Sequence, residues 1–220
     1  MAYCTIAVAL AAAPTRSVAY GKEVWECYAE TISPEPAQLL LRVSNGTKKG
    51  TLFATKKTGD RLIISGDLIL NDPSNATVLY GQMFCDAHDD QFVNEVIIVG
   101  RLSKKAKVSD TQKSAARSIA VNRYNNGEEL TDWFRLRGYG FSMDKLVEAP
   151  TGSLISAHGC LEQKANREGD PYMEIKCRSV RVHSKGKATA TNPAQGTSAI
   201  GYNQEDFESS DNDMPFDWSK

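Results

Sequence analysis

Five short segments rich in β-branched and aromatic residues follow one another in the second half of the chain. They span residues 93–102, 116–124, 132–139, 153–161 and 172–182. Such segments predict strands, and turn residues such as Asn125-Asn126-Gly127 separate them. A short helix over residues 142–149 is predicted between the third and fourth strands, with Ser142 as its cap and Pro150 ending it. This order indicates an OB fold, a small Greek-key barrel that commonly binds oligonucleotides.

The first half of the chain repeats the second weakly, at an offset of 93 residues. The offset pairs Ile6 with Val99, Arg42 with Arg135, Gly59 with Gly152, Gly66 with Gly159 and Leu68 with Leu161. A repeat at this spacing predicts two copies of one fold. We therefore expect an all-β chain of two tandem OB-fold barrels, a divergent one in residues 1–90 and a second in residues 91–187.

Charge divides the chain in the same way. Residues 1–90 hold 8 Lys and Arg against 10 Asp and Glu, whereas residues 91–187 hold 17 against 11. Residues 188–220 hold 1 against 6, and the first part of that segment consists mostly of small and polar residues. A segment of this composition cannot bury enough apolar surface to fold, so we expect a disordered acidic tail. A basic second domain and an acidic tail predict different partners.

The tail also carries aromatic residues among its carboxylates, which is typical of a docking peptide for partner proteins. The residues predicted to bind a partner are Asp211, Asp213, Met214, Pro215, Phe216, Asp217 and Trp218. The same acidic segment could compete with nucleic acid for the basic second domain.

The predicted strand over residues 132–139 has two different faces, because successive residues of a strand point to opposite sides. Phe134, Leu136 and Gly138 suit a barrel interior. The other face carries Trp133, Arg135, Arg137 and Tyr139. Rings that stack on bases and cations that follow phosphates are the two parts of a groove that binds single strands without sequence preference. The alternative is an amphipathic strand with its polar face in water and Trp133 in the core.

Further cations and rings of the second domain are predicted to complete this groove. They are Arg101, Lys104, Lys105, Lys107, Arg117, Arg123, Tyr124, Lys164, Arg167 and Tyr172. At the offset of 93 residues, the face of residues 133–139 maps onto Leu40, Arg42, Ser44 and Gly46. The first domain thus keeps one cation and neither ring, so we expect it to serve mainly in assembly. Trp25, Tyr28 and nearby lysines could still form a secondary contact.

Other features of the sequence point away from catalysis and from secretion. The five cysteines contain no CxxC pair, and the apolar segment over residues 3–13 precedes the first cation, Arg16, so we interpret it as a strand rather than a signal peptide. We expect a cytoplasmic, nucleoid-associated protein. No catalytic constellation appears, so we expect no enzyme, no cofactor and no metal; residues 85–90 are interpreted as a polar linker, and His158 as a core residue.

Three motifs resemble those of bacterial single-stranded-DNA-binding proteins. Residues 93–102 are similar to their N-terminal signature, Asp132-Trp133-Phe134-Arg135 resembles their tryptophan strand, and Asp213-Met214-Pro215-Phe216 resembles their acidic tip. The resemblance implies that Tyr124, Trp133 and Tyr139 stack on bases and that the tip recruits replication, recombination and repair proteins. It also implies a homodimer, because four OB folds normally form the working assembly of this family.

The sequence departs from that family at two places. A stacking tryptophan expected in the long hairpin is absent, with Asn166 and Arg167 near its place, and Asp217-Trp218-Ser219-Lys220 follows the phenylalanine that normally ends the chain. Two other functions stay open: a protein-interaction scaffold of replication or restart, and an RNA-binding OB protein.

Overall fold

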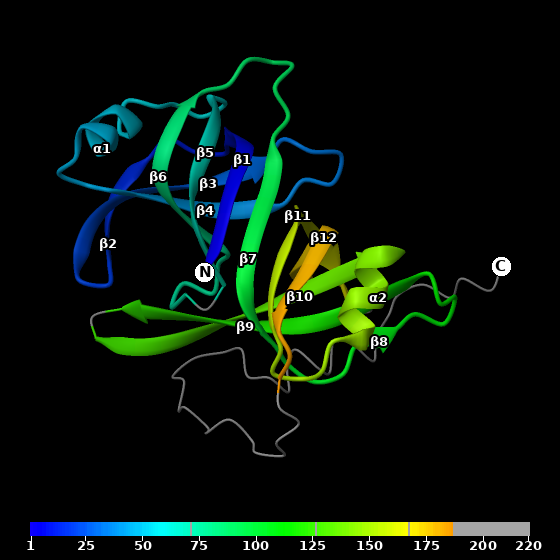
Figure 1. Ribbon diagram of the computed structural model, residues 1–220. Coiled ribbons are helices and arrows are strands. Elements are labelled where there is room, and N and C mark those ends of the chain that lie inside the picture. Colours follow the sequence, from blue (N-terminus) through cyan, green and yellow to red (C-terminus); the bar gives the residue numbers. More distant parts are fainter. Residues whose placement is uncertain (71, 126, 167, 187–220) are drawn as a thin grey trace.

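The protein forms two five-stranded barrels, each with one additional short strand, joined along one pair of strands (Figure 1). The structure is a computed structural model and describes residues 1–70, 72–125, 127–166 and 168–186. The first barrel contains β1 (Ala2–Leu10), β2 (Thr15–Ala19), β3 (Lys22–Thr31), β4 (Gln38–Ser44), α1 (Lys48–Phe53), β5 (Arg61–Ile69) and β6 (Val78–Asp86). The second contains β7 (Asn94–Leu102), β8 (Lys107–Val108), β9 (Ser114–Asn125), β10 (Glu128–Tyr139), α2 (Phe141–Glu148), β11 (Leu154–Ala165) and β12 (Pro171–Ser184).

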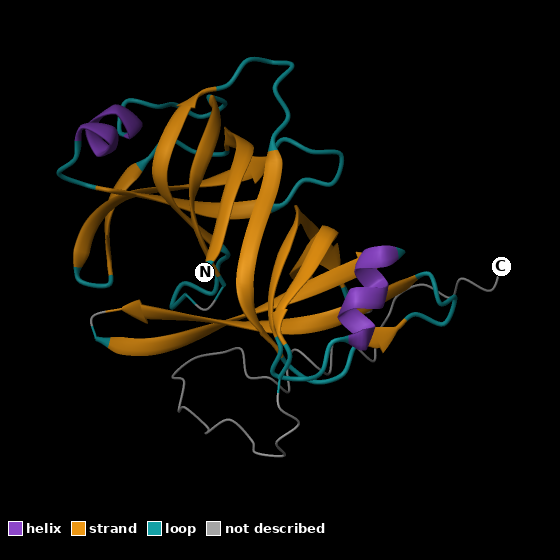
Figure 2. Cartoon of the chain, viewed as in Figure 1, coloured by secondary structure: helices purple, strands orange, loops and turns teal. Residues whose placement is uncertain are grey.

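Both barrels close in the same strand order. The first closes as β1-β3-β4-β6-β5, with β5 pairing back to β1. The second closes as β7-β9-β10-β12-β11, with β11 pairing back to β7. Along the chain, the helix comes between β4 and β5 in the first barrel and between β10 and β11 in the second (purple in Figure 2). The prediction of two tandem OB-fold barrels is therefore confirmed, whereas the domain limits at residues 90 and 187 stay predictions.

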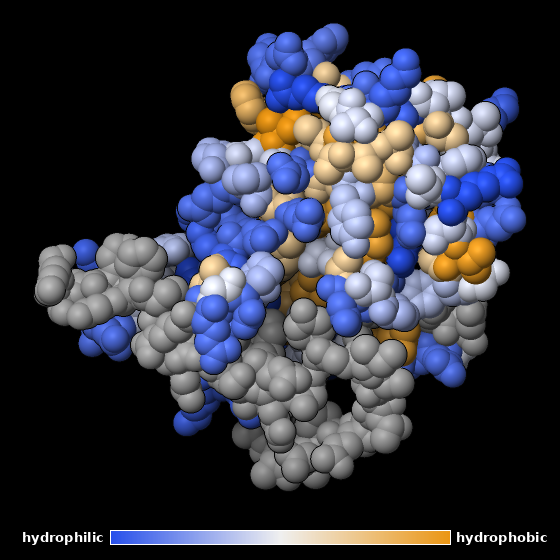
Figure 3. Space-filling model, turned by 180° about the vertical axis from the view of Figure 1, so that it is seen from behind, coloured by the Kyte–Doolittle hydropathy of each residue, from blue (hydrophilic) through white to orange (hydrophobic). Residues whose placement is uncertain are grey.

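The two barrels share one continuous sheet, because β1 pairs antiparallel with β7. Tyr3 faces Ile97 and Thr5 faces Glu95 in this pairing, and the two strands run side by side in Figure 1. The apolar segment at the start of the sequence is thus a strand, β1. Inward-facing residues of both barrels, among them Ile6, Ile64 and Leu136, belong to one buried cluster. On the opposite side, Figure 3 shows hydrophobic residues as a narrow band between hydrophilic ones.

Two glycines mark equivalent β-bulges in the barrels. The β5–β6 register shifts at Gly66 and the β11–β12 register shifts at Gly159. A Cβ at Gly66 would lie 2.0 Å from the backbone oxygen of Tyr80, and one at Gly159 would lie 2.1 Å from that of Lys176. Only glycine allows this close approach of two backbones. The offset of 93 residues therefore holds between β5, which carries Gly66, and β11, which carries Gly159.

The offset is wrong by two residues on the strand that carries the predicted binding face. Gly66 pairs with Gly81, which also pairs with Val43, whereas Gly159 pairs with Cys177, which also pairs with Gly138. Val43 therefore corresponds to Gly138, and Arg42 corresponds to Arg137 rather than Arg135. The offset changes because the two barrels differ in length between this strand and the next. The segment from Arg42 to Gly59 is two residues longer than the equivalent segment from Arg137 to Gly152. With this correction, the first barrel has Gln38 and Ser44 where the second has Trp133 and Tyr139, so it still lacks both rings.

Helix α2 begins one residue earlier than predicted and with a different cap. Gly140, at φ +49°, is the residue before the helix and makes no side-chain cap. Ser142, the predicted cap, lies inside the first turn, and its hydroxyl donates to the backbone oxygen of Arg178 at 3.2 Å. The helix ends at Glu148, one residue earlier than predicted, and Pro150 follows two residues later. Among the described residues, neither helix is long and apolar enough to cross a membrane.

Candidate nucleic-acid interface

Four aromatic side chains lie on one outer face of the second barrel. In the antiparallel pairing of β9 with β10, Trp133 faces Ala120, Tyr139 faces Ser114 and Glu129 faces Tyr124. Residues that face each other share one side of a sheet, so Tyr124, Trp133 and Tyr139 lie on the same face. The side opposite carries Phe134 and Leu136, both buried in the barrel. The parity predicted from the sequence is therefore the parity of β10.

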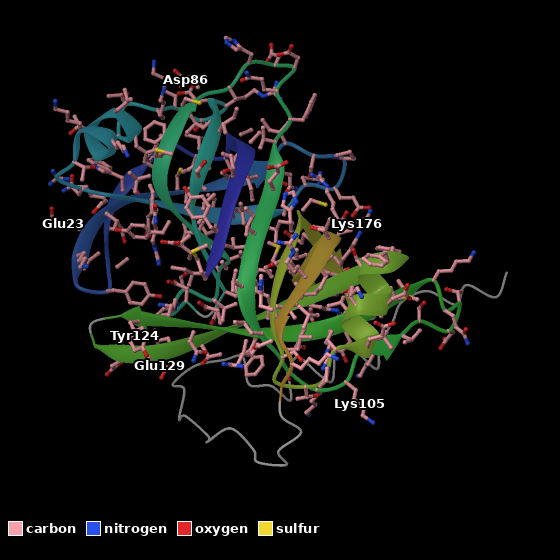
Figure 4. The ribbon with its side chains drawn as sticks, in the orientation of Figure 1. Glu23, Asp86, Lys105, Tyr124, Glu129 and Lys176 are labelled. Atoms are coloured by element: carbon pink, nitrogen blue, oxygen red, sulfur yellow. The ribbon has the colours of Figure 1, made fainter. Side chains whose placement is uncertain are left out.

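Strand β12 adds a fourth ring to this face. Arg135 faces Glu174 across the parallel β10–β12 pairing, so Tyr172, Glu174 and Lys176 share the side of Trp133. Tyr124 is 76% exposed and Tyr139 is 47% exposed. Figure 4 places Tyr124 with Glu129 on the hairpin between β9 and β10, and Lys176 on β12. We call this surface, formed by Tyr124, Trp133, Tyr139 and Tyr172, the aromatic face.

Arg135 and Arg137 lie on the aromatic face but are buried under it, at 2% and 8% exposure. Both bind Glu174, which is 1% exposed: the Nε of Arg135 lies 3.0 Å from one carboxylate oxygen and the Nε of Arg137 lies 2.7 Å from the other. Burial alone would lower the pKa of Arg137, but its hydrogen bond with Glu174 raises that pKa, so the guanidinium of Arg137 is ionised. The sequence predicted the face of both guanidinium groups correctly, but the expectation that they are exposed on that face was wrong.

The buried arginines support the rings above them. The guanidinium of Arg135 lies 4.9 Å from the centroid of the Tyr172 ring, at the distance of a cation–π contact. At the other end of the face, the ammonium of Lys176 lies 5.8 Å from the Tyr139 ring. These contacts orient Tyr172 and Tyr139, so this part of the stacking surface exists before a ligand arrives. Such preorganisation lowers the entropic cost of binding.

The lysines at the edge of the aromatic face also have carboxylate neighbours. Lys164 lies 3.1 Å from Glu162 and contacts Glu35, which comes from the loop between β3 and β4 of the first barrel. Lys176 lies 3.3 Å from the same Glu162. Although burial would lower the pKa of Lys164, its hydrogen bonds with Glu35 and Glu162 raise it. Glu174 and Glu162 thus neutralise much of the positive charge on this face.

Arg117 and Arg123, two other predicted contacts, bind other parts of the protein. Arg117 faces Leu136, so it points to the barrel side of β9. It is buried and donates to the backbone oxygens of Leu146 and Ala149, at 2.6 and 2.5 Å. Burial lowers the pKa of Arg117 to about 10. Its position at the C-terminus of α2 satisfies carbonyls that the helix leaves without partners.

Arg123 joins the two barrels. Its Nε donates to Asp132 at 2.7 Å, and its guanidinium lies 5.7 Å from the ring of Tyr20, which is in the turn between β2 and β3 of the first barrel. The hydroxyl of Tyr20 donates in turn to Asp72 at 2.7 Å. Arg123 therefore belongs to the contact between the barrels, on the side of β9 opposite to Tyr124.

The remaining predicted cations are exposed or lie outside the described residues. Arg101, Lys104, Lys105 and Lys107 are exposed, and Arg101 donates to the backbone oxygen of Gly152 at 3.0 Å. Lys107 faces Ala116, which faces Arg137, so it shares the side of the aromatic face next to Tyr139. Arg167 and the predicted partner-binding residues 211–218 lie outside the described residues.

Sequence reasoning missed Glu174, Glu162 and Lys176. The signal was present in the alternation of β12, in which Tyr172, Glu174 and Lys176 share one parity. What the sequence did not show is that β12 pairs with β10 and places Glu174 beside two arginines.

His158, predicted to be a core residue, is instead partly exposed on the outside of β11, 3.9 Å from Glu95. No group of three or more His, Cys, Asp or Glu side chains within the described part of the chain is placed to hold a metal ion.

Comparison with solved structures identifies the fold. The single-stranded DNA binding protein from Thermus aquaticus superposes with a TM-score of 0.61 over 87% of this chain and 97% of that chain, at 12% sequence identity. The chain has the fold of a single-stranded DNA binding protein. A deletion mutant of the same Thermus protein gives the same TM-score at 10% identity, over 87% of this chain and 98% of that one. No protein-family model matches the sequence, and no curated protein does.

The fold comparison confirms the resemblance that the sequence motifs indicated, at the level of architecture. It covers both barrels, so the divergent first half belongs to the shared fold as well. In the present chain, the aromatic face lies on β9, β10 and β12 of the second barrel. The site residues themselves stay predictions, because similarity at 12% identity compares backbones rather than side chains.

Proposed function

We propose that this protein binds single-stranded DNA without sequence preference, through the aromatic face of the second barrel. The observation that carries the proposal is the placement of Tyr124, Trp133, Tyr139 and Tyr172 on one side of three adjacent strands. Stacking of a base on a protein ring contributes about 1–3 kcal/mol and tolerates any base. The shared fold with the Thermus single-stranded DNA binding protein supports the proposal.

Binding on this face depends more on stacking than on phosphate contacts. Glu174 already neutralises part of the charge of Arg135 and Arg137, and Glu162 does so for Lys164 and Lys176. We infer that bases lie on the rings and that phosphates reach the exposed lysines 104, 105 and 107 beyond Tyr139. Such a division holds the strand by its bases, through stacking that tolerates any base.

Two finer proposals accompany this function. Two chains associate into a homodimer with four barrels, and the acidic tail recruits proteins of replication, recombination and repair. Support for the dimer comes from exposed apolar residues on the outside of the shared sheet, such as Ile97, which is 47% exposed. Light scattering of the full chain tests the dimer: a single-chain mass contradicts it.

Fluorescence titration with oligo-dT tests the central proposal. We expect saturable quenching, because a base stacked on Trp133 changes the surroundings of that indole. The chain has three tryptophans, so two variants assign the signal: Trp133→Phe should still bind but lose the quenching, and Trp25→Phe should keep it. An oligo-U competitor measures preference over RNA. If the titration shows no quenching and a labelled oligonucleotide shows no shift, the proposal of DNA binding is contradicted.

Salt dependence tests the division between rings and lysines. On a single strand, each phosphate contact contributes about −0.7 to the slope of log K against log salt concentration. Replacing Lys104, Lys105 and Lys107 together with glutamine should make the slope shallower by up to about 2. The matched variant replaces Lys164 and Lys176, which lie on the aromatic face at 3.1 and 3.3 Å from Glu162, and should change the slope by less than about 0.7. The reverse ranking of the two variants would show that phosphates bind on the aromatic face itself.

A further inference from the structure

The outer face of the first barrel corresponds to the aromatic face but has different chemistry. In the corrected register, Leu40 of the first barrel corresponds to Arg135 of the second, and Val78 corresponds to Glu174. Leu40 faces Val78 across β4 and β6, just as Arg135 faces Glu174 across β10 and β12. In the same way, Ile69 faces Val78 as Glu162 faces Glu174. Three charged residues of the second barrel thus correspond to three apolar residues of the first.

Those three apolar residues form a small second core on the outside of the first barrel. Leu40, Ile69 and Val78 are buried together, with Ala76 and Tyr80 packed against them. Ala76 belongs to residues 72–77, at the end of the connection from β5 to β6. The backbone nitrogen of Leu40 donates to the backbone oxygen of Thr77 at 2.9 Å, which brings this connection against β4. An outer barrel face becomes buried in this way only when another part of the molecule covers it.

Asp72 fastens the same connection to the barrel. Its carboxylate is 4% exposed as a residue and accepts hydrogen bonds from Arg42 at 2.6 Å and from Tyr20 at 2.7 Å. It also accepts from the backbone nitrogen and the hydroxyl of Ser74, at 2.9 and 2.5 Å. Although burial alone would raise the pKa of Asp72, these hydrogen bonds lower it, so the carboxylate is ionised. A buried carboxylate with this many donors is held firmly.

Arg42, the cation that the first barrel retains, therefore binds carboxylates of its own chain. Its Nη1 binds Asp72 and its Nε binds Glu26 at 3.0 Å, and the residue is buried. The corresponding Arg137 instead binds Glu174, which comes from its own sheet, at 2.7 Å. On the first barrel, a phosphate could reach the guanidinium of Arg42 only by displacing Asp72.

We propose that the connection from Asp72 to Thr77 covers the outer face of the first barrel around Leu40, Arg42 and Val78, so that each chain has a single face for single-stranded DNA. This inference rests on the proposed function and adds the number of binding faces to it. The closure is permanent in the folded protein, because the covered residues are apolar and the fastening carboxylate is buried. A homodimer then has four barrels and two binding faces.

Native mass spectrometry of the full chain with a short oligo-dT of about 8 nucleotides, a length that fits one OB fold, counts the faces. We expect one oligonucleotide per chain at saturation, none with Trp133→Ala/Tyr139→Ala, and unchanged stoichiometry and affinity with Tyr28→Ala. Tyr28 is the matched control, since it is exposed beside Leu40 on the first barrel. Two oligonucleotides per chain, or loss of binding in Tyr28→Ala, would overturn the inference.

Hydrogen exchange tests the closure without DNA. The amides of Ser74 and Asn75 donate to Asp72, at 2.9 Å each. These two amides should therefore exchange slowly, equally with and without oligonucleotide, and faster in Asp72→Ala. Fast exchange in the native chain, or a change at these residues on DNA binding, would overturn the closure. Slow exchange in a chain that binds no oligonucleotide would overturn the proposed function and leave the closure supported.

Discussion

Replacing Trp133 and Tyr139 with alanine is expected to remove most of the affinity for single-stranded DNA. Each base stacked on a ring contributes about 1–3 kcal/mol, so two rings contribute about 2–6 kcal/mol, or roughly 30-fold to 10⁴-fold in Kd. Both side chains lie on the same side of β10 and lie outside the buried cluster, so their removal leaves the barrel interior intact. Fluorescence anisotropy of a labelled oligo-dT measures the loss without relying on tryptophan emission.

The control for this variant comes from the first barrel. Tyr28→Ala removes an exposed ring, and Trp25→Phe removes an indole that packs against the core and donates to Asn45 at 3.0 Å. We expect a change of less than about threefold in Kd from each, below the cost of one stacked base. If the first-barrel variants weaken binding more than Trp133→Ala/Tyr139→Ala does, the roles of the two barrels are the reverse of those proposed.

The fold could be predicted because its determinants are local. Alternation of apolar residues along residues 132–139 placed Phe134 and Leu136 inside the barrel, and each predicted strand of the second barrel exists, with the hairpin strands extended by a few residues. Strand pairs that follow one another in the chain need only a turn between them. Gly66 and Gly159 could be matched across the repeat because a β-bulge at a close backbone approach requires glycine at both.

The charges of the site could not be predicted, because they depend on pairings between distant segments. Glu174 neutralises Arg135 and Arg137 only because β12 pairs in parallel with β10. This pairing brings Glu174 beside Arg137, which is 37 residues earlier in the chain. Arg117 and Arg123 look like phosphate contacts in the sequence, but one binds the end of α2 and the other contacts the first barrel. Parity along one strand gives the face of a side chain, whereas its partners come from the fold.

Replacing Glu174 with alanine is expected to destabilise the protein by about 3–5 kcal/mol, the usual cost of removing one partner from a buried ion pair. The substitution leaves Arg135 and Arg137 buried beneath the aromatic face without their shared carboxylate. Urea unfolding followed by circular dichroism measures the free energy of unfolding. The matched control is Glu162→Gln, whose partners Lys164 and Lys176 have side chains 32% and 49% exposed; it should cost about 0–1 kcal/mol.

A second variant separates the charge of Glu174 from its packing. In Arg135→Met/Arg137→Met/Glu174→Leu, all three charges give way to apolar side chains, so no buried charge is left without a partner, and stability should return toward that of the native protein. Affinity for oligo-dT should fall, since Tyr172 loses the guanidinium 4.9 Å from its ring. If Glu174→Ala costs no more than Glu162→Gln, the carboxylate does not hold the arginines in place. The aromatic face would then owe its order to the rings alone.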